Sequence, residues 1–181
     1  PKDALIILSV GELNKNKNHE VVIKAITKIN KYNVHYVICG QGQLDGYLKK
    51  LSKELGIENQ VHLLGFRNDI PEIYKISDIF AFPSLREGLS VALMESMANG
   101  LAVVCSSIRG NTDLIEDGQG GYLHEPYDYL GLAERVNRLI KTPSKAKEMG
   151  NLNIIESRKY DIRNIKLMMT KVYENILNDR V

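Results

Sequence analysis

The stretch PSLREGLSVALMESMANG, residues 83–100, places two glutamates around the start of a predicted helix, directly after an apolar strand. The first turn of a helix offers unpaired backbone N–H groups and the positive end of the helix dipole, so the turn from Glu87 to Leu89 suits a phosphate. If the helix begins near residues 88–90, Glu95 lies roughly 8 to 10 Å farther along its axis, at about 1.5 Å per residue. This separation matches the reach of a pyrophosphate.

Each of the two carboxylates can accept hydrogen bonds from hydroxyl groups, so the stretch predicts a ligand with a diphosphate between two polyols, as in a nucleotide-sugar. Glu87 would then face the sugar, the N–H groups of residues 88–90 the phosphates, and Glu95 the ribose. In the alternative, Glu87 only complements the helix dipole and Glu95 is solvated. The apolar neighbours of Glu95 argue against a solvated side chain, because a shielded carboxylate needs a partner.

Outside this stretch, short apolar runs alternate with helical patterns. The runs are continuous, as in strands that helices cover on both faces. They span residues 4–10, 34–39, 61–64, 79–82 and 101–105, and a turn at 116–122 leads to a short last strand. The helical patterns span residues 18–30, 44–55, 69–75, 90–99, a segment near 112, 130–141 and 144–153. This order predicts an α/β fold with a Rossmann-like, doubly wound parallel sheet, in which ligands bind beyond the carboxyl ends of the strands.

The loop after the first predicted strand carries a glycine and two lysines, and the loop after the second is rich in glycine. In GELNKNKNHE, Gly11 permits close backbone approach, and Lys17, nearest the next helix, is the better candidate to neutralise a phosphate, with Lys15 second. Taken alone, a lysine in a polar loop is usually solvated surface. After the second strand, the dinucleotide-binding motif GxGxxG would need glycine where Asp45 stands, so the motif is incomplete. Gly40 could serve either a tight turn or contact with a ligand.

Two more strand-end loops could line a ligand. Phe66 and Arg67 follow the third strand and could form a wall for a planar base. An apolar plug, with Asp69 or Asn68 capping the next helix, explains the same residues without a ligand. The loop at 106–113, after the fifth strand, could line the sugar pocket.

Composition excludes several classes of function. The formal net charge is only +2, from 24 Lys and Arg against 22 Asp and Glu, which argues against nucleic-acid binding or an electrostatic membrane anchor. Cys39 and Cys105 are predicted to be buried free thiols, and the His spacing predicts no metal site. The sequence contains no GxSxG elbow, so it gives no indication of a serine hydrolase. Without a membrane span or signal peptide in the sequence, we expect a cytoplasmic protein.

We expect one domain over residues 1–181, with a C-terminal helix at 160–181. Its apolar residues fall on one helical stripe, formed by Ile165, Met168, Met169, Val172, Tyr173, Ile176 and Leu177. A stripe of this kind must pack on something, and core packing is the prediction.

In this order the motifs resemble the C-terminal, donor-binding domain of family 4 glycosyltransferases, which are retaining enzymes of the two-domain GT-B architecture. The resemblance covers nearly the whole chain, and the first loop looks like that of polysaccharide-assembly enzymes. The matching pieces are Val10-Gly11 with Lys17, residues 37–42, 61–65 and 77–82, Pro83-Ser84, the EX7E pair Glu87 and Glu95, residues 97–104 and the turn at 117–121.

The resemblance implies transfer of a sugar from a nucleoside diphosphate sugar, with a UDP-sugar expected, to a glycan or lipid-linked acceptor. It implies no metal or other cofactor. Glu87, on the sugar hydroxyls, and Lys17, on the diphosphate, would carry the catalytic roles. The expected donor-binding residues are Gly11, Asn14, Lys17, Gly40, Phe66, Arg67, Ser84, Glu87, Gly88, Leu89, Ser90 and Glu95.

Two departures from the family pattern matter. Many relatives carry arginine where this chain has Glu12, so the phosphate loop lacks a cation that Lys15 or Asn14 would have to replace. The N-terminal acceptor domain of the polypeptide is not in this sequence, so we expect the chain alone to bind nucleotide without transferring sugar. The full-length enzyme could reach a membrane-associated acceptor at the inner membrane face. The open alternatives are a noncatalytic nucleotide-sugar-binding module and half of a nucleotide-sugar 2-epimerase.

Overall fold

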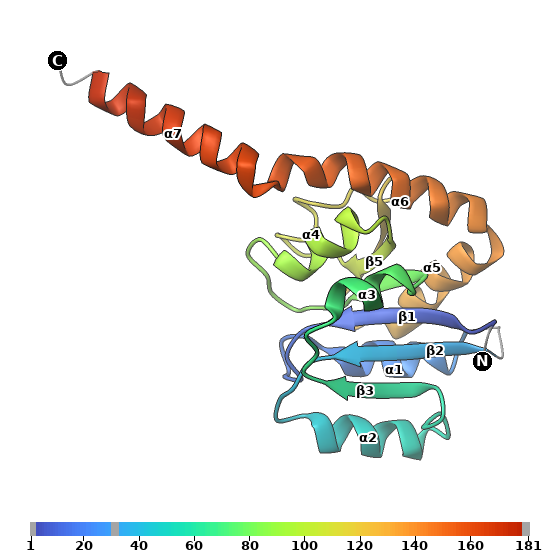
Figure 1. The fold of residues 1–181 in the computed structure, drawn as a ribbon. Helices are drawn as coiled ribbons and strands as arrows, with labels where there is room; N and C mark the ends of the chain where they lie inside the picture. Colours follow the sequence, from blue (N-terminus) through green and yellow to red (C-terminus); the bar gives the residue numbers. More distant parts are fainter. Residues whose placement is uncertain (1–2, 30–32, 179–181) are drawn as a thin grey trace.

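A computed structural model describes residues 3–29 and 33–178 and contains a six-stranded parallel sheet with helices on both faces (Figure 1). The strand order is β3-β2-β1-β4-β5-β6, which confirms the predicted doubly wound, Rossmann-like fold. The strands are β1 (Leu5–Val10), β2 (Val34–Cys39), β3 (Val61–Gly65), β4 (Ile79–Phe82), β5 (Ala102–Ser106) and β6 (Gly121–His124).

The helices follow the predicted order with one exception. They are α1 (His19–Ile26), α2 (Asp45–Glu54), α3 (Ile70–Lys75), α4 (Val91–Ala98), α5 (Tyr129–Lys141), α6 (Pro143–Ser157), the short 3-10 turn η1 (Arg158–Tyr160) and α7 (Ile162–Asn178). The helix expected near Thr112 is wrong, because this segment forms hydrogen-bonded turns in which Asn111 and Thr112 both donate N–H groups to Ile108 O. Its few apolar residues cannot make a stripe long enough for a helix.

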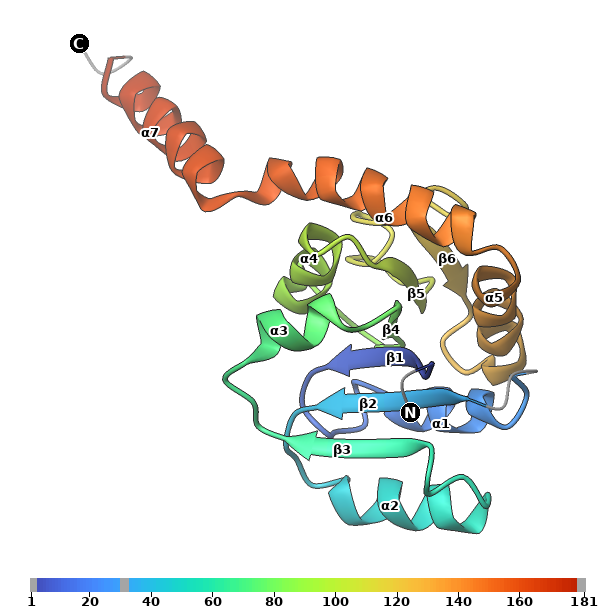
Figure 2. The same cartoon turned by 45° about the vertical axis from the view of Figure 1, so that its right-hand side comes forward.

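The sheet separates two hydrophobic cores. In β1, Ile7 packs into the core beneath α1, α2 and α5, while the next residue, Leu8, packs into the core beneath α3 and α4. Successive strand side chains point to opposite faces, so a strand covered on both sides needs an unbroken apolar run. Figure 2 shows the two layers of helices on either side of the strands. Cys39 and Cys105 are buried free thiols, as predicted.

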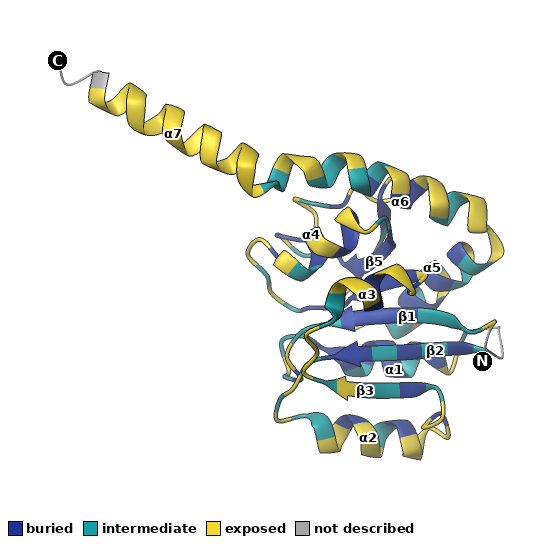
Figure 3. Ribbon diagram, in the orientation of Figure 1, coloured by how far each residue is buried: buried dark blue, intermediate teal, exposed yellow. Residues whose placement is uncertain are grey.

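The C-terminal helix α7 departs from the prediction of core packing. Residues 162–177 are all exposed, and the helix projects away from the body of the molecule (Figures 1 and 3). The apolar stripe is present, but nothing in the described part of the chain covers it. Residues 179–181, at the end of the predicted C-terminal helix, lie outside the described residues, as does residue 30 at the end of the first predicted helix. Within the described ranges, no helix is both long and apolar enough to cross a membrane.

Candidate functional site

The centre of the candidate site is an ion pair between two loops that follow β1 and β4. Lys17 Nζ lies 2.6 Å from Glu87 Oε1, and the two side chains are only 20% and 12% exposed. The same ammonium lies 4.9 Å from the centre of the Phe82 ring, within the range of a cation–π interaction. A shielded pair is screened by salt less than a surface pair. The structure thus brings together the two side chains expected to act in catalysis.

Hydrogen bonds hold these two loops together on either side of Lys17. Leu85 N donates to Asn16 O at 2.8 Å, and Asn16 Nδ2 donates to Arg86 O at 2.9 Å. Asn18 Nδ2 donates to Pro83 O at 3.3 Å. Backbone and amide contacts therefore fix the segment that carries Lys17 against the segment that leads to Glu87.

A buried polar network lies beneath the loop after β1. His19 Nδ1 is 2.9 Å from Tyr36 Oη, and His19 Nε2 is 3.3 Å from Glu12 O. Tyr36 Oη donates to Ser9 Oγ at 2.9 Å, and Ser9 Oγ donates to Ala81 O at 2.6 Å. Burial lowers the pKa of His19 to about 4, so its ring is neutral at pH 7. Because the Tyr36 hydroxyl donates to Ser9, the single N–H of the neutral His19 ring lies on Nδ1 and donates to Tyr36 Oη, so the network ties the start of α1 to β1, β2 and β4.

Helix α4 presents free backbone donors beside the ion pair. Ser90 is its N-cap, and Ser90 Oγ accepts a hydrogen bond from Leu93 N at 3.4 Å. The N–H groups of residues 88–92 have no acceptor among the described residues. Gly88 and Leu89 are exposed, so an anion can reach these donors and the positive end of the helix dipole.

Two glycines allow neighbouring loops to touch. At Gly110, where φ is +91°, an added Cβ would lie 2.1 Å from Gly88 O, so the loop after β5 packs on the loop after β4. A Cβ at Gly40 would lie 1.8 Å from Gly11 O. Close packing of two backbones therefore accounts for Gly40 without a ligand, which favours the tight-turn interpretation of that residue.

Glu95 lies on α4 and is exposed. The single O–H of Tyr74 is shared between Ala92 O at 3.0 Å and Glu95 Oε2 at 3.4 Å, and burial is the largest cause that raises the pKa of Tyr74. Leu93 and Met97 are buried in the core and leave Glu95 on the other face of the helix. The expectation that apolar neighbours shield Glu95 was wrong because sequence neighbours on a helix point in different directions.

The loop after β3 is open. Phe66 is 69% exposed, which contradicts an apolar plug. Arg67 donates to both carboxylate oxygens of Asp69, at 2.7 and 2.5 Å, so the Asp69 side chain does not cap α3. Through these hydrogen bonds Arg67 lowers the pKa of Asp69. The Phe66 ring is left as an uncovered aromatic surface.

The departure at Glu12 has a structural consequence. Asn14 Nδ2 donates to Glu12 Oε2 at 2.9 Å, while Asn14 Oδ1 accepts from Lys17 N at 2.9 Å. Asn14 thus holds the Glu12 carboxylate and supports Lys17, and it is not free to act as a phosphate clamp by itself. The Lys15 ammonium is exposed and forms no ion pair with any described residue.

Ser84 is fully buried, whereas Gly88 and Leu89, also expected to bind the donor, are exposed. Ser84 O accepts a hydrogen bond from Ser106 Oγ, and Ser84 Oγ has no partner among the described residues. Its side chain therefore faces the interior, between the ends of β4 and β5, and the structure does not bring it to the surface that carries Glu87.

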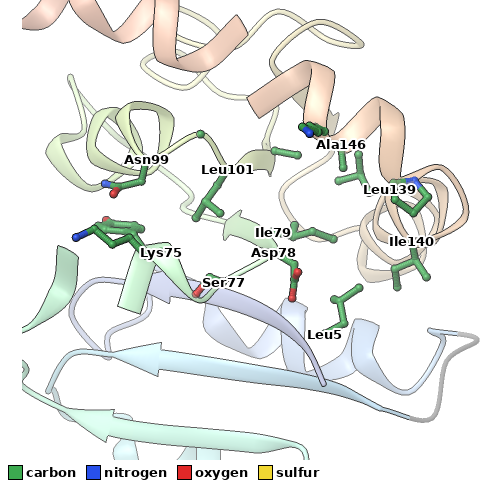
Figure 4. A pocket seen from close by; sticks show the side chains of 15 residues that line it. Leu5, Lys75, Ser77, Asp78, Ile79, Asn99, Leu101, Leu139, Ile140 and Ala146 are labelled. Carbon is green, nitrogen blue, oxygen red and sulfur yellow. The ribbon is translucent and has the colours of Figure 1, made fainter. Parts of the chain in front are cut away.

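A cavity of about 450 Å³ lies at the opposite end of the sheet (Figure 4). It is lined by Leu5 and Ile79, the first residues of β1 and β4, and by Leu139 and Ala146 from α5 and α6. Ligands of doubly wound sheets bind beyond the carboxyl ends of the strands, so this cavity is not the candidate site. Within residues 3–29 and 33–178, no group of three or more His, Cys, Asp or Glu could hold a metal ion.

Sequence reasoning missed the asparagines beside Lys17 and the Tyr74 partner of Glu95. The signal for the first was the alternation NKNKN, in which asparagine recurs at every second position of a loop. Asparagine tolerates left-handed backbone and bonds backbone groups well, so its repetition beside a candidate lysine was informative. Nothing local indicated Tyr74, because it lies on another helix.

Comparison with known proteins gives the family. The family model described as glycosyl transferases group 1 matches residues 1–154. A Campylobacter jejuni relative named as an N-acetylgalactosaminyltransferase acting on a diphospho-undecaprenol-linked sugar is 35% identical over 156 residues, which are 86% of this chain and 42% of that protein. An Escherichia coli relative named as a UDP-Gal:alpha-D-GlcNAc-diphosphoundecaprenol alpha-1,3-galactosyltransferase is 35% identical over 145 residues, which are 77% of this chain and 37% of that protein.

Solved structures agree with this assignment. Anabaena HepE in complex with UDP superposes with a TM-score of 0.90 and 26% identity, over 96% of this chain and 49% of HepE. The chain therefore spans less than half the length of these relatives. The order of motifs, the strand topology and the family match agree, and the chain belongs to the glycosyl transferases group 1 family, with a GT-B-type Rossmann-like fold.

Proposed function

We propose that this chain is the donor-binding half of a retaining glycosyltransferase that transfers a sugar from a UDP-sugar to a glycan or lipid-linked acceptor. Names of the relatives support this choice of substrates. The E. coli relative is named for UDP-Gal and a diphosphoundecaprenol-linked acceptor, and HepE has been solved with UDP and with UDP-glucose.

One observation carries the proposal: the Lys17–Glu87 ion pair lies beside the free N–H groups of residues 88–92. Cleavage of the sugar–phosphate bond leaves negative charge on the diphosphate. A lysine and a helix N-terminus supply fixed positive charge at that point, which is the interaction that usually contributes most to such catalysis.

The ion pair also suggests how donor binding proceeds. Before the donor arrives, Glu87 holds the Lys17 ammonium in place at 2.6 Å. An ammonium has three N–H donors, so Lys17 can donate hydrogen bonds to Glu87 and to a diphosphate oxygen at the same time. Each lone pair of Glu87 that remains free can accept a hydrogen bond from a sugar hydroxyl. Glu87 would thus bind and orient the donor sugar.

We further propose that the other half of the enzyme supplies the acceptor site and covers α7. Two features support this: the chain spans less than half of its relatives, and the apolar stripe of α7 is exposed. An exposed apolar helix face of this length is typical of an interaction surface. A lipid-linked acceptor would place the full-length enzyme at the inner face of the membrane.

Titration of the chain with UDP, GDP and ADP tests donor binding. We expect UDP to shift the amide resonances of residues 16–18 and 88–92, with weaker shifts for the other two nucleotides. If none of the three perturbs these residues at millimolar concentration, the donor-site assignment is wrong.

A radiolabelled-transfer assay with the same chain tests its status as half an enzyme. We expect no sugar transfer from any UDP-sugar by the chain alone, and transfer by the full-length protein. Transfer by the chain alone would show that it carries its own acceptor site.

A further inference from the structure

The geometry points to Asn18 as a positioning residue that fixes the Lys17 ammonium against Glu87 before a donor binds. This role rests on the proposed function, because it assigns the effect of Asn18 to the diphosphate contact made by Lys17. Asn18 is 7% exposed and would not touch the donor itself.

The backbone of Asn18 supplies the first part of the argument. Its φ and ψ are +51° and +36°, and it is the only non-glycine residue with a positive φ among the described residues. This left-handed conformation is strained for most L-residues but accessible to asparagine and glycine. It lies between Lys17 and the first residue of α1, so it sets the direction in which the chain leaves Lys17.

The side chain of Asn18 supplies the second part. Its Nδ2 donates to Pro126 O at 2.8 Å and to Pro83 O at 3.3 Å. Pro83 follows β4 and Pro126 lies two residues past β6, so one amide joins two strands that β5 separates in the sheet. The amide has two hydrogens, and both are used on buried or partly buried carbonyl groups.

These contacts reach both partners of the ion pair. Asn18 directly follows Lys17, and Pro83 begins the short segment that leads to Glu87. The hydrogen bonds between residues 16 and 85–86 make that segment a single unit with the lysine loop. Loss of the Asn18 amide would remove the contacts of the lysine loop with Pro83 and Pro126, and the contacts of Asn16 and Glu87 alone would hold Lys17 less firmly.

Three variants of Asn18 separate the backbone contribution from the amide contribution. Asn18→Gly keeps the left-handed backbone and removes the amide. Asn18→Asp keeps a similar shape but sets carboxylate oxygens against two carbonyl oxygens. Asn18→Ala removes the amide and also strains the backbone. The matched control is Asn59→Gly, an exposed turn residue whose side chain bonds to no described residue.

The probes are UDP and inorganic pyrophosphate, with binding measured by calorimetry and chemical-shift titration. We expect Asn18→Gly to weaken both by about 3- to 10-fold, the loss typical of one or two hydrogen bonds. Asn18→Asp and Asn18→Ala should weaken both further, and Asn59→Gly should change neither. An equal loss for the two probes places the effect at the phosphates and not at the base.

A double-mutant cycle distinguishes positioning of Lys17 from general stabilisation. If Asn18 acts through Lys17, the loss caused by Asn18→Gly should shrink to less than about 2-fold in the Lys17→Ala background. Thermal melting of each variant shows whether it is folded. If Asn18→Ala does not fold, the binding comparison is made with Asn18→Gly.

Two results would overturn this role alone: wild-type affinity in Asn18→Gly and Asn18→Asp, or an undiminished loss in the Lys17→Ala background. If the wild-type chain binds neither UDP nor pyrophosphate, the proposed function is wrong, and the role of Asn18 is wrong with it.

Discussion

The two sides of the candidate site differ in how firmly they are built. The interlocked side, residues 16–18 with 83–87, is joined by an ion pair and by hydrogen bonds between segments about 70 residues apart. The open side, Phe66, Arg67 and Glu95, is exposed and has few contacts with the rest of the chain.

This difference follows the parts of the proposed donor. A diphosphate carries concentrated charge, and fixed donors stabilise charge best when they need no rearrangement. A base and a ribose offer a flat face and hydroxyl groups, which exposed side chains can meet by rotating. In the proposed enzyme, the other half of the polypeptide would complete the open side.

The largest expected effect concerns the acid stability of the chain, through His19, which directly follows the interlocked side. His19 is buried and neutral, with its pKa near 4 against about 6.5 when unfolded. As pH falls from 6.5 to 4, the unfolded chain binds a proton that the folded chain does not, so stability is lost over this window, by up to about 3 kcal/mol. Urea unfolding at pH 7.5, 5.5 and 4.5 measures this loss, and His19→Gln should reduce it. Parallel pH dependence in the two proteins would contradict the neutral, buried state of His19.

Removal of the Lys17 ammonium should come next. Lys17→Ala leaves Glu87 partly buried and unpaired and removes a charged contact to the diphosphate, so UDP affinity should fall by about 2 kcal/mol, roughly 30-fold. The control is Lys15→Ala, which removes an exposed lysine without an ion-pair partner and should lose less than about 3-fold. Equal losses in calorimetry would mean that the Lys17–Glu87 pair is not the phosphate site.

On the open side, Glu95→Ala should weaken UDP binding by about 1 to 2 kcal/mol through the lost charged hydrogen bond to the ribose. The same variant should bind UDP and 2′-deoxy-UDP equally, whereas the wild type should prefer UDP. If the variant keeps the wild-type preference, Glu95 has only its structural contact with Tyr74.

Phe66→Ala should have a smaller effect. Loss of an exposed stacking surface is expected to weaken UDP binding by about 1 kcal/mol and to leave pyrophosphate binding unchanged. Calorimetry with both ligands makes the comparison. A loss for pyrophosphate would mean that the loop after β3 supports the interlocked side and does not bind the base.

The smallest effect is expected far from both sides, on α7. Met168 and Met169 of the stripe are exposed, so Met168→Ser and Met169→Ser should change the free energy of unfolding of this chain by less than about 0.5 kcal/mol and leave UDP binding unchanged. Urea unfolding provides the measurement. A loss above about 1 kcal/mol would show that the stripe is buried in solution, for example between two copies of the chain.

Much of this arrangement could be predicted from sequence because its rules are local or topological. Alternating apolar runs and helical patterns fix a parallel sheet, and a parallel sheet places every strand-end loop at one edge. That is why Lys17 and Glu87 could be assigned to one site although 70 residues separate them. Their direct ion pair could not be predicted, since it depends on loop conformation.

The errors have physical reasons too. The hydrogen bonds from Asn18 to Pro83 and Pro126 were missed because they join residues that no single sequence window contains. Glu95 was expected to be shielded because its sequence neighbours are apolar, but α4 turns those neighbours into the core. The apolar stripe on α7 was identified correctly from its periodicity. Its partner could not be identified, because periodicity shows that a helix face is apolar but does not show which surface covers that face.

A structure of the chain with UDP bound tests the central claim most directly. The account predicts that the diphosphate lies within hydrogen-bond distance of Lys17 Nζ and of N–H groups from residues 88–92, with the ribose at Glu95. A diphosphate bound elsewhere, for example in the cavity between Leu5 and Leu139, or bound without contact to Lys17, would contradict it.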